Sequence, residues 1–179
     1  SKWVFNEKYY FRSGLTFPNS SAIGFSARCL PSGSIISVKG QGLYPRKAGD
    51  VHFALALLNS RLAHGVINIL NPGKDVQAGD IKILPFGSPN EAAAIRVVPL
   101  VDTILGHMMR IHSCDETSPV FARPSVAAQS ASSNSPTLSF SSEFLAYARE
   151  IEANENELER VVYAAYGLSA NDMQFFMND

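Results

Sequence analysis

Residues 53–85, FALALLNSRLAHGVINILNPGKDVQAGDIKILP, divide the chain into a strand-like first part and a helical second part. Apolar residues recur at steps of three and four at the start of this stretch, which predicts a helix. Asp50 is its expected N-cap, and the helix should run into the polar step at 59–61 and stop at Gly65. After an Asn-Pro-Gly turn, alternating apolar residues at 81–85 predict a closing strand.

Three short strands are expected before this stretch, at residues 3–12, 23–30 and 34–38. They are rich in aromatic and β-branched residues, and clusters of Gly, Pro, Ser and Asn separate them. A loop at 39–47, which carries glycines, a tyrosine and basic residues, leads into the helix. Turns about every ten residues predict a small twisted sheet or partial barrel with one packed helix.

The chain after residue 89 should be helical. A helix is expected at 90–112, with Asn90 as its N-cap. Pro99 lies inside this pattern, so we expect a kink there, or a restart with Pro99 at a first helical position. Residues 113–138 are rich in Ser, Ala and Pro without periodicity. This composition predicts a flexible linker or loop.

A second long helix should begin at Ser142, as its cap, and end at Gly167. Its apolar residues form a near-heptad stripe with acidic residues outside it. The two long helices could therefore pair as an antiparallel hairpin, each covering the apolar stripe of the other. Ser169 and Asp172 predict a capped final turn followed by an apolar plug. The predicted fold class is thus α+β, with a sheet domain at 1–89 and a helical region at 90–179.

Charge divides the same two parts. The chain has 15 basic and 16 acidic residues, of which residues 1–90 hold ten basic and four acidic ones. Residues 91–179 hold five basic and twelve acidic ones. Such a split indicates an anionic partner for the basic part. A solvated surface with uneven charge explains the split equally well.

The composition also bears on where the protein works. No uninterrupted apolar run approaches the ~20 residues that a membrane span needs, and residues 1–5 lack the pattern of a signal peptide. Cys29 and Cys114 form no recognisable pair, which favours a reducing, cytoplasmic setting without membrane contact. The chain opens on strand-like sequence without an initiator Met, so we expect a fragment of a larger protein.

The sequence holds no constellation typical of catalysis or metal binding. The four histidines have no metal-ligand spacing with each other or with the cysteines. The segment Gly40-Gln41-Gly42 alone is weak evidence for a phosphate loop, and no Gly-x-Ser-x-Gly elbow exists. Asn71-Pro72 is followed by Gly73-Lys74, so it lacks the aromatic residue that completes the Asn-Pro-Pro-Tyr motif of amino-methyltransferases. We therefore expect no catalytic residue and no metal ligand in this chain.

An ordered set of short motifs runs through nearly the whole chain. They are YFRSGLTF at 10–17, GFSAR at 24–28, the Pro31-x-Gly33 turn, LALLNS at 55–60, LNP at 70–72, GDIKILP at 79–85, CDETSPVF at 114–121, NENEL at 154–158 and YGL at 166–168. In this order they resemble the target recognition domain and C-terminal helical region of BREX-type adenine-specific DNA methyltransferases. The Leu-x-x-Leu-Asn-Ser and Ile-x-x-Leu-Pro pair is also similar to recognition domains of type IIG and type I restriction-modification proteins. The tryptophans that the family carries near 114–119 are absent, and the loop at 122–138 is shorter than the family's helical insert.

The resemblance implies a role in reading DNA rather than in methylating it. It implies double-stranded DNA and the methyltransferase domain of the same polypeptide as partners, with other subunits of the defence system as further ones. No cofactor is implied in this chain, because S-adenosylmethionine would bind in the catalytic domain, which would also extrude the target adenine. Basic loop residues would hold phosphates, and polar ones would read base edges.

The candidate DNA-binding residues fall into three groups. They are Arg12, Ser13, Thr16, Asn19, Ser20 and Ser21 on the first loop, Lys39, Gln41, Tyr44, Arg46 and Lys47 on the second, and Asn59, Ser60, Arg61, Lys74 and Gln77 around the opening stretch. Arg46 and Lys47 are the foremost phosphate candidates. Asn59 and Ser60 could instead hold backbone groups at a helix end, and Arg28 could be a structural ion-pair partner.

Two other functions are compatible with the composition. In the first, the basic sheet docks an acidic protein partner, and the helical hairpin mediates oligomerisation or domain packing. In the second, the chain is an enzyme by itself, which the missing catalytic constellation disfavours. Binding of labelled duplex DNA at low and moderate salt would distinguish the interaction module from the DNA reader.

Overall fold

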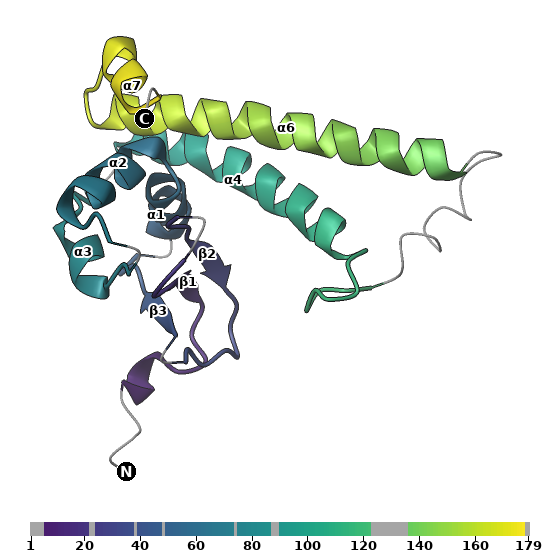
Figure 1. The fold of residues 1–179 in the computed structure, drawn as a ribbon, viewed down its shortest axis with the longest axis horizontal. Coiled ribbons are helices and arrows are strands. Elements are labelled where there is room, and N and C mark those ends of the chain that lie inside the picture. The colour runs from purple at the N-terminus through teal and green to yellow at the C-terminus, as the bar shows by residue number, and fades with distance from the viewer. Residues whose placement is uncertain are drawn as a thin grey trace. The chain divides into compact units, whose positions relative to one another are not determined.

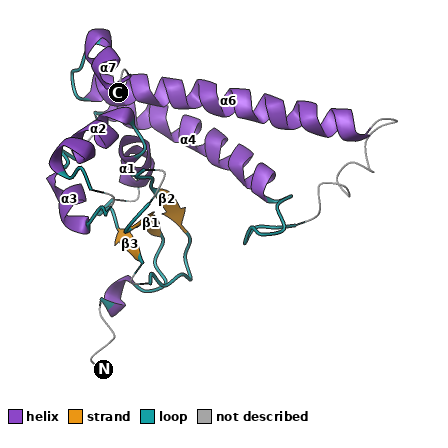
Figure 2. Cartoon of the chain, viewed as in Figure 1, coloured by secondary structure: helices purple, strands orange, loops and turns teal. Residues whose placement is uncertain are grey.

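A computed structural model describes residues 6–21, 24–37, 39–47, 49–73, 75–86, 90–122 and 136–177, without the side chains of 136–141, 170 and 175–177. This part of the chain contains a three-stranded antiparallel sheet and six α-helices (Figures 1 and 2), which confirms the α+β fold class. The chain divides into two compact units. Unit 1 comprises Ser1–Val97 and Glu159–Asp179, and unit 2 comprises Val98–Leu158.

The sheet of unit 1 has its first strand in the centre. β1 (Gly14–Pro18) lies between β2 (Arg28–Leu30) and β3 (Gly40–Leu43), and both pairings are antiparallel. Leu15 and Phe17 are buried, as expected for alternate residues that share one face of a strand. This face packs against α1, so the sheet and the first helix form the core of unit 1.

The first two predicted strands, at 3–12 and 23–30, are wrong or too long. Residues 3–5 of the predicted strand 3–12 lie outside the described residues, and a 3-10 helix, η1 (Glu7–Tyr9), follows. Asn6 and Phe11 flank this helix in the left-handed region, each with a φ of 59°. This conformation breaks an extended chain. Of the predicted strand 23–30, only β2 is extended, and Ile23 lies outside the described residues.

The predicted strand at 34–38 does not form at residues 34–37, and Val38 lies outside the described residues. The strand forms in the following glycine segment, at β3. A Cβ atom added to Gly42 would come within 2.4 Å of Ile36 Cδ1 and 2.9 Å of Tyr44 Cε2. A Cβ added to Gly14 on β1 would lie 2.7 Å from the Leu43 carbonyl oxygen. These glycines therefore serve close packing within the sheet rather than turns.

The predicted helix around 50–65 is two helices, α1 (Asp50–Leu58) and α2 (Arg61–Leu70), which continues through Gly65. Ser60 starts the second helix, because its Oγ accepts a hydrogen bond from the Ala63 N–H at 3.2 Å and donates one to the Leu57 carbonyl at 2.6 Å. Asp50 is the first residue of α1 rather than its N-cap, which is Gly49. The polar residues at 59–61 therefore separate two helices, and Ser60 among them is the N-cap of α2.

The closing strand predicted at 81–85 is wrong, since this segment lies largely in α3 (Ala78–Ile83). Ile81 and Leu84 are buried while Ile83 is exposed, so the buried residues follow helical rather than alternating spacing. The Asp80 carboxylate accepts a hydrogen bond from the Gln77 N–H at 2.8 Å and thereby caps the helix.

The helix predicted at 90–112 is confirmed as α4 (Glu91–His112). The Ala93 N–H donates to Asn90 Oδ1 at 2.8 Å, which confirms the predicted cap. Pro99 lies inside a single helix, so the restart does not occur. By length and apolar composition α4 would suffice to cross a membrane, although charged residues interrupt it. Core helices of soluble proteins share these properties, so α4 does not indicate whether the protein is in a membrane.

Unit 2 contains an antiparallel hairpin, as predicted. α6 (Pro136–Ala165) pairs with α4 through His107 and Glu150, whose Nε2 and Oε2 atoms are 2.6 Å apart. One turn further along α4, Arg110 donates to the hydroxyl of Tyr147, which lies one turn earlier on α6. The predicted start at Ser142 is wrong, because α6 begins six residues earlier, at Pro136. Within the predicted linker, residues 113–122 form hydrogen-bonded turns, and 123–135 lie outside the described residues.

The C-terminal end of unit 1 is built as the sequence predicts. Gly167 has a φ of 68°, and the Leu168 N–H donates to the Tyr163 carbonyl at 3.0 Å, which ends α6 in a Schellman motif. Asp172 Oδ2 accepts from the Ser169 N–H at 2.7 Å. This confirms the capped turn, which continues as α7 (Ala170–Met177) and packs against α2.

Candidate nucleic-acid interface

A groove of about 1070 Å³ opens on the surface of unit 1. Its floor includes Phe17 of β1 and Phe53 of α1. One wall comes from η1 and the chain that follows β3, and the other comes from α3 and the residues after it. The groove therefore combines segments that are far apart in sequence, including parts of the predicted second loop.

Two tyrosines form the first wall. The rings of Tyr9 and Tyr44 are stacked, with centroids 4.7 Å apart and an interplanar angle of 18°. The Tyr44 ring also packs over the backbone of Gly14 and Gly42, where an added Cβ would come within 2.9 Å of it. Burial raises the pKa of the Tyr44 hydroxyl, and the Arg12 charge opposes this effect. Tyr44 is thus a fixed structural element of the wall.

Basic side chains surround this tyrosine pair. The Arg12 guanidinium carbon lies 5.9 Å from the Tyr9 ring centroid, and Lys8 Nζ lies 5.0 Å from it. These distances are typical of cation–π contacts. Arg46 lines the groove, and both Arg46 and the neighbouring Lys47 are exposed. The structure therefore brings together Arg12, Tyr44 and Arg46, which the sequence placed on two separate loops.

A pair of amide side chains joins β3 to the residue that follows β1. Gln41 Nε2 donates to Asn19 Oδ1 at 2.7 Å. Thr16 Oγ1 donates to the Gln41 carbonyl at 3.0 Å, so this candidate hydroxyl stabilises the sheet. An amide nitrogen carries two N–H groups, so Gln41 keeps one donor beyond its bond to Asn19. Gln41 consequently has the chemistry to read a base edge while it remains held in place.

The other candidates of the first two loops lie mostly at the surface. Ser13, Ser20 and Lys39 are exposed, and Ser20 forms an isolated β-bridge with Asp75. Ser21 is half-buried and lines a smaller hollow beside Phe25. None of these four side chains lines the large groove.

Asn59 and Ser60 have structural roles, in agreement with the alternative that their sequence position suggested. The Asn59 amide donates to the carbonyls of Ala27 and Leu55, both at 3.0 Å, and accepts from the Ala27 N–H at 2.9 Å. It thereby ties the end of α1 to the residue before β2. Ser60 is buried at the start of α2. Neither side chain is positioned as a free loop contact.

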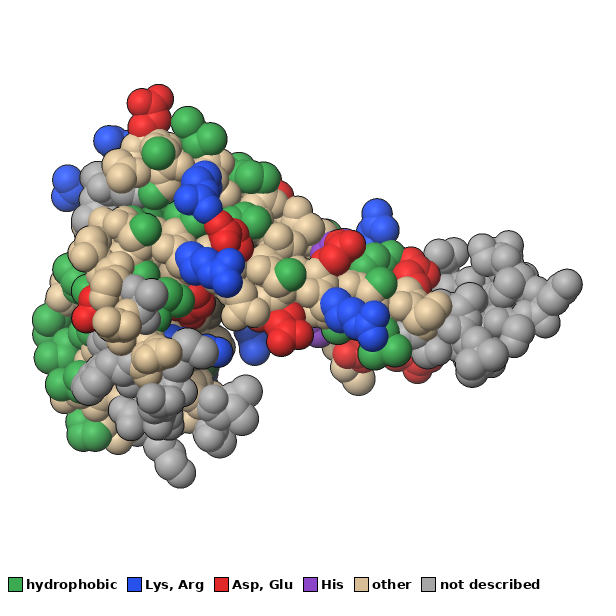
Figure 3. All heavy atoms as spheres, turned by 90° about the horizontal axis from the view of Figure 1, so that it is seen from above, with side chains coloured by type: hydrophobic (Ala, Val, Ile, Leu, Met, Phe, Trp, Pro, Cys, Tyr) green, Lys and Arg blue, Asp and Glu red, His purple; other side chains and the backbone are tan. Residues whose placement is uncertain are grey.

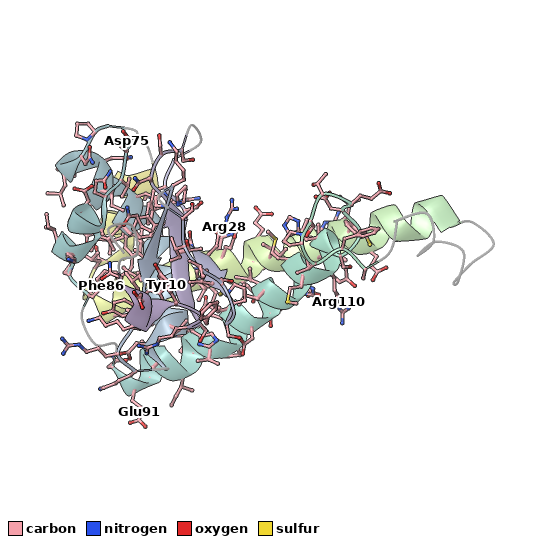
Figure 4. All side chains as sticks on the ribbon, turned by 90° about the horizontal axis from the view of Figure 1, so that it is seen from below. Tyr10, Arg28, Asp75, Phe86, Glu91 and Arg110 are labelled. Atoms are coloured by element: carbon pink, nitrogen blue, oxygen red, sulfur yellow. The ribbon has the colours of Figure 1, made fainter. Side chains whose placement is uncertain are left out.

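The remaining candidates around the opening stretch lie at helix starts. Arg61 is exposed, and its backbone N–H donates to Glu159 Oε1 at 2.8 Å. Gln77 is exposed and precedes α3. Lys74 lies outside the described residues. Arg28, considered as a structural residue, is exposed on β2 (Figure 4).

Most residues that line the groove were not among the candidates, and two of them form much of its second wall. Lys82 of α3 and Phe86 after it line the second wall, and Phe86 is 39% exposed. Both were missed because the alternation at 81–85 predicted a strand, which would have placed them elsewhere. The three-residue step from Ile81 to Leu84 was the signal for a helix that would have found them.

Patches of like charge and clusters of metal ligands would mark other candidate sites. On the face shown in Figure 3, acidic and basic side chains are interspersed and form no patch of one sign among the residues drawn in colour. Within the described ranges, no three His, Cys, Asp or Glu side chains are close enough together to hold a metal ion. The groove and its basic rim are therefore the candidate interface.

No family model matches the sequence. The chain is 25% identical over 171 residues to the adenine-specific methyltransferase PglX of Lacticaseibacillus casei (strain Zhang). The match covers 92% of the chain but only 14% of PglX. Over most of its length, the chain is thus similar to one region of an adenine-specific methyltransferase.

Proposed function

We propose that the chain is the DNA-reading region of an adenine-specific DNA methyltransferase of the BREX type. Methyl transfer would belong to a catalytic domain of the same polypeptide, which would bind S-adenosylmethionine. The similarity to PglX supports the association with an adenine methyltransferase. The order of the recognition-domain motifs along the chain supports the assignment to target reading. Other subunits of the defence system are further proposed partners, in the cytoplasm.

One observation carries the proposal. Arg46 and Gln41 line one groove, and Arg12, from a separate loop, lies over the ring of Tyr9, which also lines it. Arginine guanidinium groups match phosphate geometry and fix a protein's register on duplex DNA without reading its sequence. A glutamine amide, by contrast, distinguishes bases through the donors and acceptors of the major groove. The rim of the groove thus supplies both kinds of contact that a target-reading region needs.

In the proposed mechanism, these side chains have different roles. Arg12, Arg46 and Lys47 would bind phosphates, and Gln41 would read a base edge with its remaining N–H and its carbonyl oxygen. Thr16 and Asn19 would hold Gln41 in the orientation it needs, through the 3.0 and 2.7 Å hydrogen bonds. A reader held by its neighbours loses less conformational entropy on binding, which increases its contribution to specificity.

Selection from a random duplex pool tests this function. The 179-residue chain should enrich a short motif, and duplexes carrying it should bind more tightly than scrambled ones. Replacing Gln41 with Ala should weaken binding to the enriched motif by about 1–3 kcal/mol and leave scrambled DNA unaffected. Enrichment of no motif, or an equal loss on both DNAs, would contradict target reading by Gln41.

A second candidate function has its own support in unit 2. Met109 of α4 is 59% exposed and Leu145 of α6 is 58% exposed. Exposed apolar side chains on a hairpin favour protein contact, as in the alternative of an interaction module that oligomerises. Sedimentation of the chain and of its Met109→Lys, Leu145→Lys variant tests this function. A dimer that the variant abolishes would support it, and a monomer at all concentrations would contradict it.

A further inference from the structure

We propose that the groove of unit 1 accepts an unpaired nucleotide of the bound DNA, with its base against Phe86 and Tyr10 and its phosphate near Arg46 and Lys82. The inference rests on the proposed function, since it assumes that the chain binds DNA. It adds that the groove selects unpaired over paired nucleotides. The two walls, their charges and their rigidity carry the inference.

Aromatic rings are available on both walls. Tyr10 and Phe86 both line the groove, from the end of η1 and from the chain after α3. Phe86 keeps an exposed ring, whereas the faces of Tyr9 and Tyr44 are engaged with each other. Bases that are not stacked in a duplex bind to such rings without regard to sequence.

The size of the groove fits this ligand class. Pockets for small molecules usually measure about 300–1,000 Å³, and this groove measures about 1070 Å³. A paired base cannot enter it, because the duplex keeps each base stacked between its neighbours. The groove therefore discriminates between paired and unpaired nucleotides by access.

Charge complementarity favours a nucleotide over a neutral aromatic ligand. Arg46 and Lys82 both line the groove, and Asp50 is the single acidic residue among the described lining residues. Asp50 begins α1, where the helix dipole offsets its negative charge. Two cations facing an aromatic-lined space match a base with an attached phosphate.

Both walls are held in place before any ligand binds. On the second wall, the Phe86 N–H donates to the Leu84 carbonyl at 2.8 Å, and the Tyr166 hydroxyl donates to the Pro85 carbonyl at 2.5 Å. On the first wall, Tyr44 is fixed by its stack with Tyr9. A preformed site loses little entropy on binding, so a nucleotide can enter without rearrangement of the sheet.

Fluorescence anisotropy with two labelled DNAs tests the inference. One is a 20-base-pair duplex, and the other is the same duplex with a single unpaired adenine. The full chain should bind the second DNA at least tenfold more tightly, and Phe86→Ala should remove this advantage without changing affinity for the perfect duplex. Phe121→Ala is the matched control, because Phe121 is 40% exposed and lies in unit 2. It should keep the advantage.

The outcomes separate the inference from the proposed function. Equal affinity for both DNAs would overturn the inference and leave duplex reading intact. Loss of the advantage in the Phe121→Ala variant would also overturn it. Binding to the unpaired adenine alone, with the same sensitivity to Phe86→Ala, would support the groove and contradict duplex reading. No binding to either DNA would overturn both. If Phe86→Ala lowers the melting temperature measured by circular dichroism, Lys82→Ala replaces it and should reduce the same advantage.

Discussion

The two compact units are stabilised by different kinds of contact. In unit 1, the buried residues of α1 pack on the sheet, and the Tyr44 ring packs over the backbone of Gly14 and Gly42. In unit 2, polar contacts such as His107–Glu150 join the hairpin, while apolar side chains such as Met109 remain exposed. Unit 1 therefore depends on side-chain fit, and unit 2 depends more on polar contacts between its two helices. This contrast predicts which substitutions will change the free energy of unfolding.

The largest expected difference comes from the buried core. Replacing Leu58 of α1, which is fully buried, with Ala should lower the free energy of unfolding by about 2–5 kcal/mol, because it leaves a cavity. Replacing the exposed Met109 of α4 with Ala should change it by less than about 0.5 kcal/mol. Urea denaturation followed by circular dichroism measures both values. Similar losses in the two variants would break the comparison.

Glycine substitutions should have opposite signs in the two units. Gly42→Ala in β3 forces a Cβ to within 2.9 Å of the Tyr44 ring, which its stack with Tyr9 holds in place, so it should destabilise the protein by about 1–3 kcal/mol. Gly106→Ala in α4 meets no atom within 4 Å, and it should stabilise the protein by about 0.5–1 kcal/mol, since alanine favours a helix. The same urea titration measures both. If Gly42→Ala left the free energy of unfolding unchanged, the sheet would have room for a Cβ atom at this position, which would contradict the prediction.

A smaller effect is expected from His64 of α2. Burial lowers the pKa of His64, and its Nε2 has no hydrogen-bond partner. The unfolded chain, with a pKa of about 6.5, then takes up a proton more readily than the folded one. Stability should be complete above that value and fall as the pH drops from about 7 toward the lowered pKa.

The His64 prediction is checked by the slope of stability against pH. Urea titrations between about pH 5 and 7.5 should show a loss toward acid that His64→Gln removes. His112→Gln, an exposed substitution at the end of α4, should keep the loss. An unchanged slope in His64→Gln would assign the loss to another group.

Helix ends could be predicted from sequence because their signals are local. Asn90 caps α4 and Gly167 ends α6 through bonds to residues at most five positions away. A side chain and the backbone near it make these bonds in any tertiary context. The basic candidates Arg12 and Arg46 were also recognisable, because their charge and loop position are properties of the sequence itself.

The sheet and the second groove wall could not be predicted, because they depend on contacts distant in sequence. Gly42 is in a strand because Ile36 and Tyr44 fill the space that its missing side chain leaves, which no local rule for glycine indicates. Ile81, Ile83 and Leu84 satisfy an alternating pattern nearly as well as a helical one, and the contact of α3 with α2 decides between them. Lys82 and Phe86 join the site only through that choice.

The salt dependence of duplex affinity tests the central claim, that the basic rim of the groove binds DNA phosphates. Affinity of the chain for a labelled duplex is measured from low to moderate salt, together with Arg46→Ala and, as control, Arg149→Ala on the exposed face of α6. The logarithmic slope should fall by about one for Arg46→Ala and stay unchanged for Arg149→Ala. An unchanged slope for Arg46→Ala would contradict the claim.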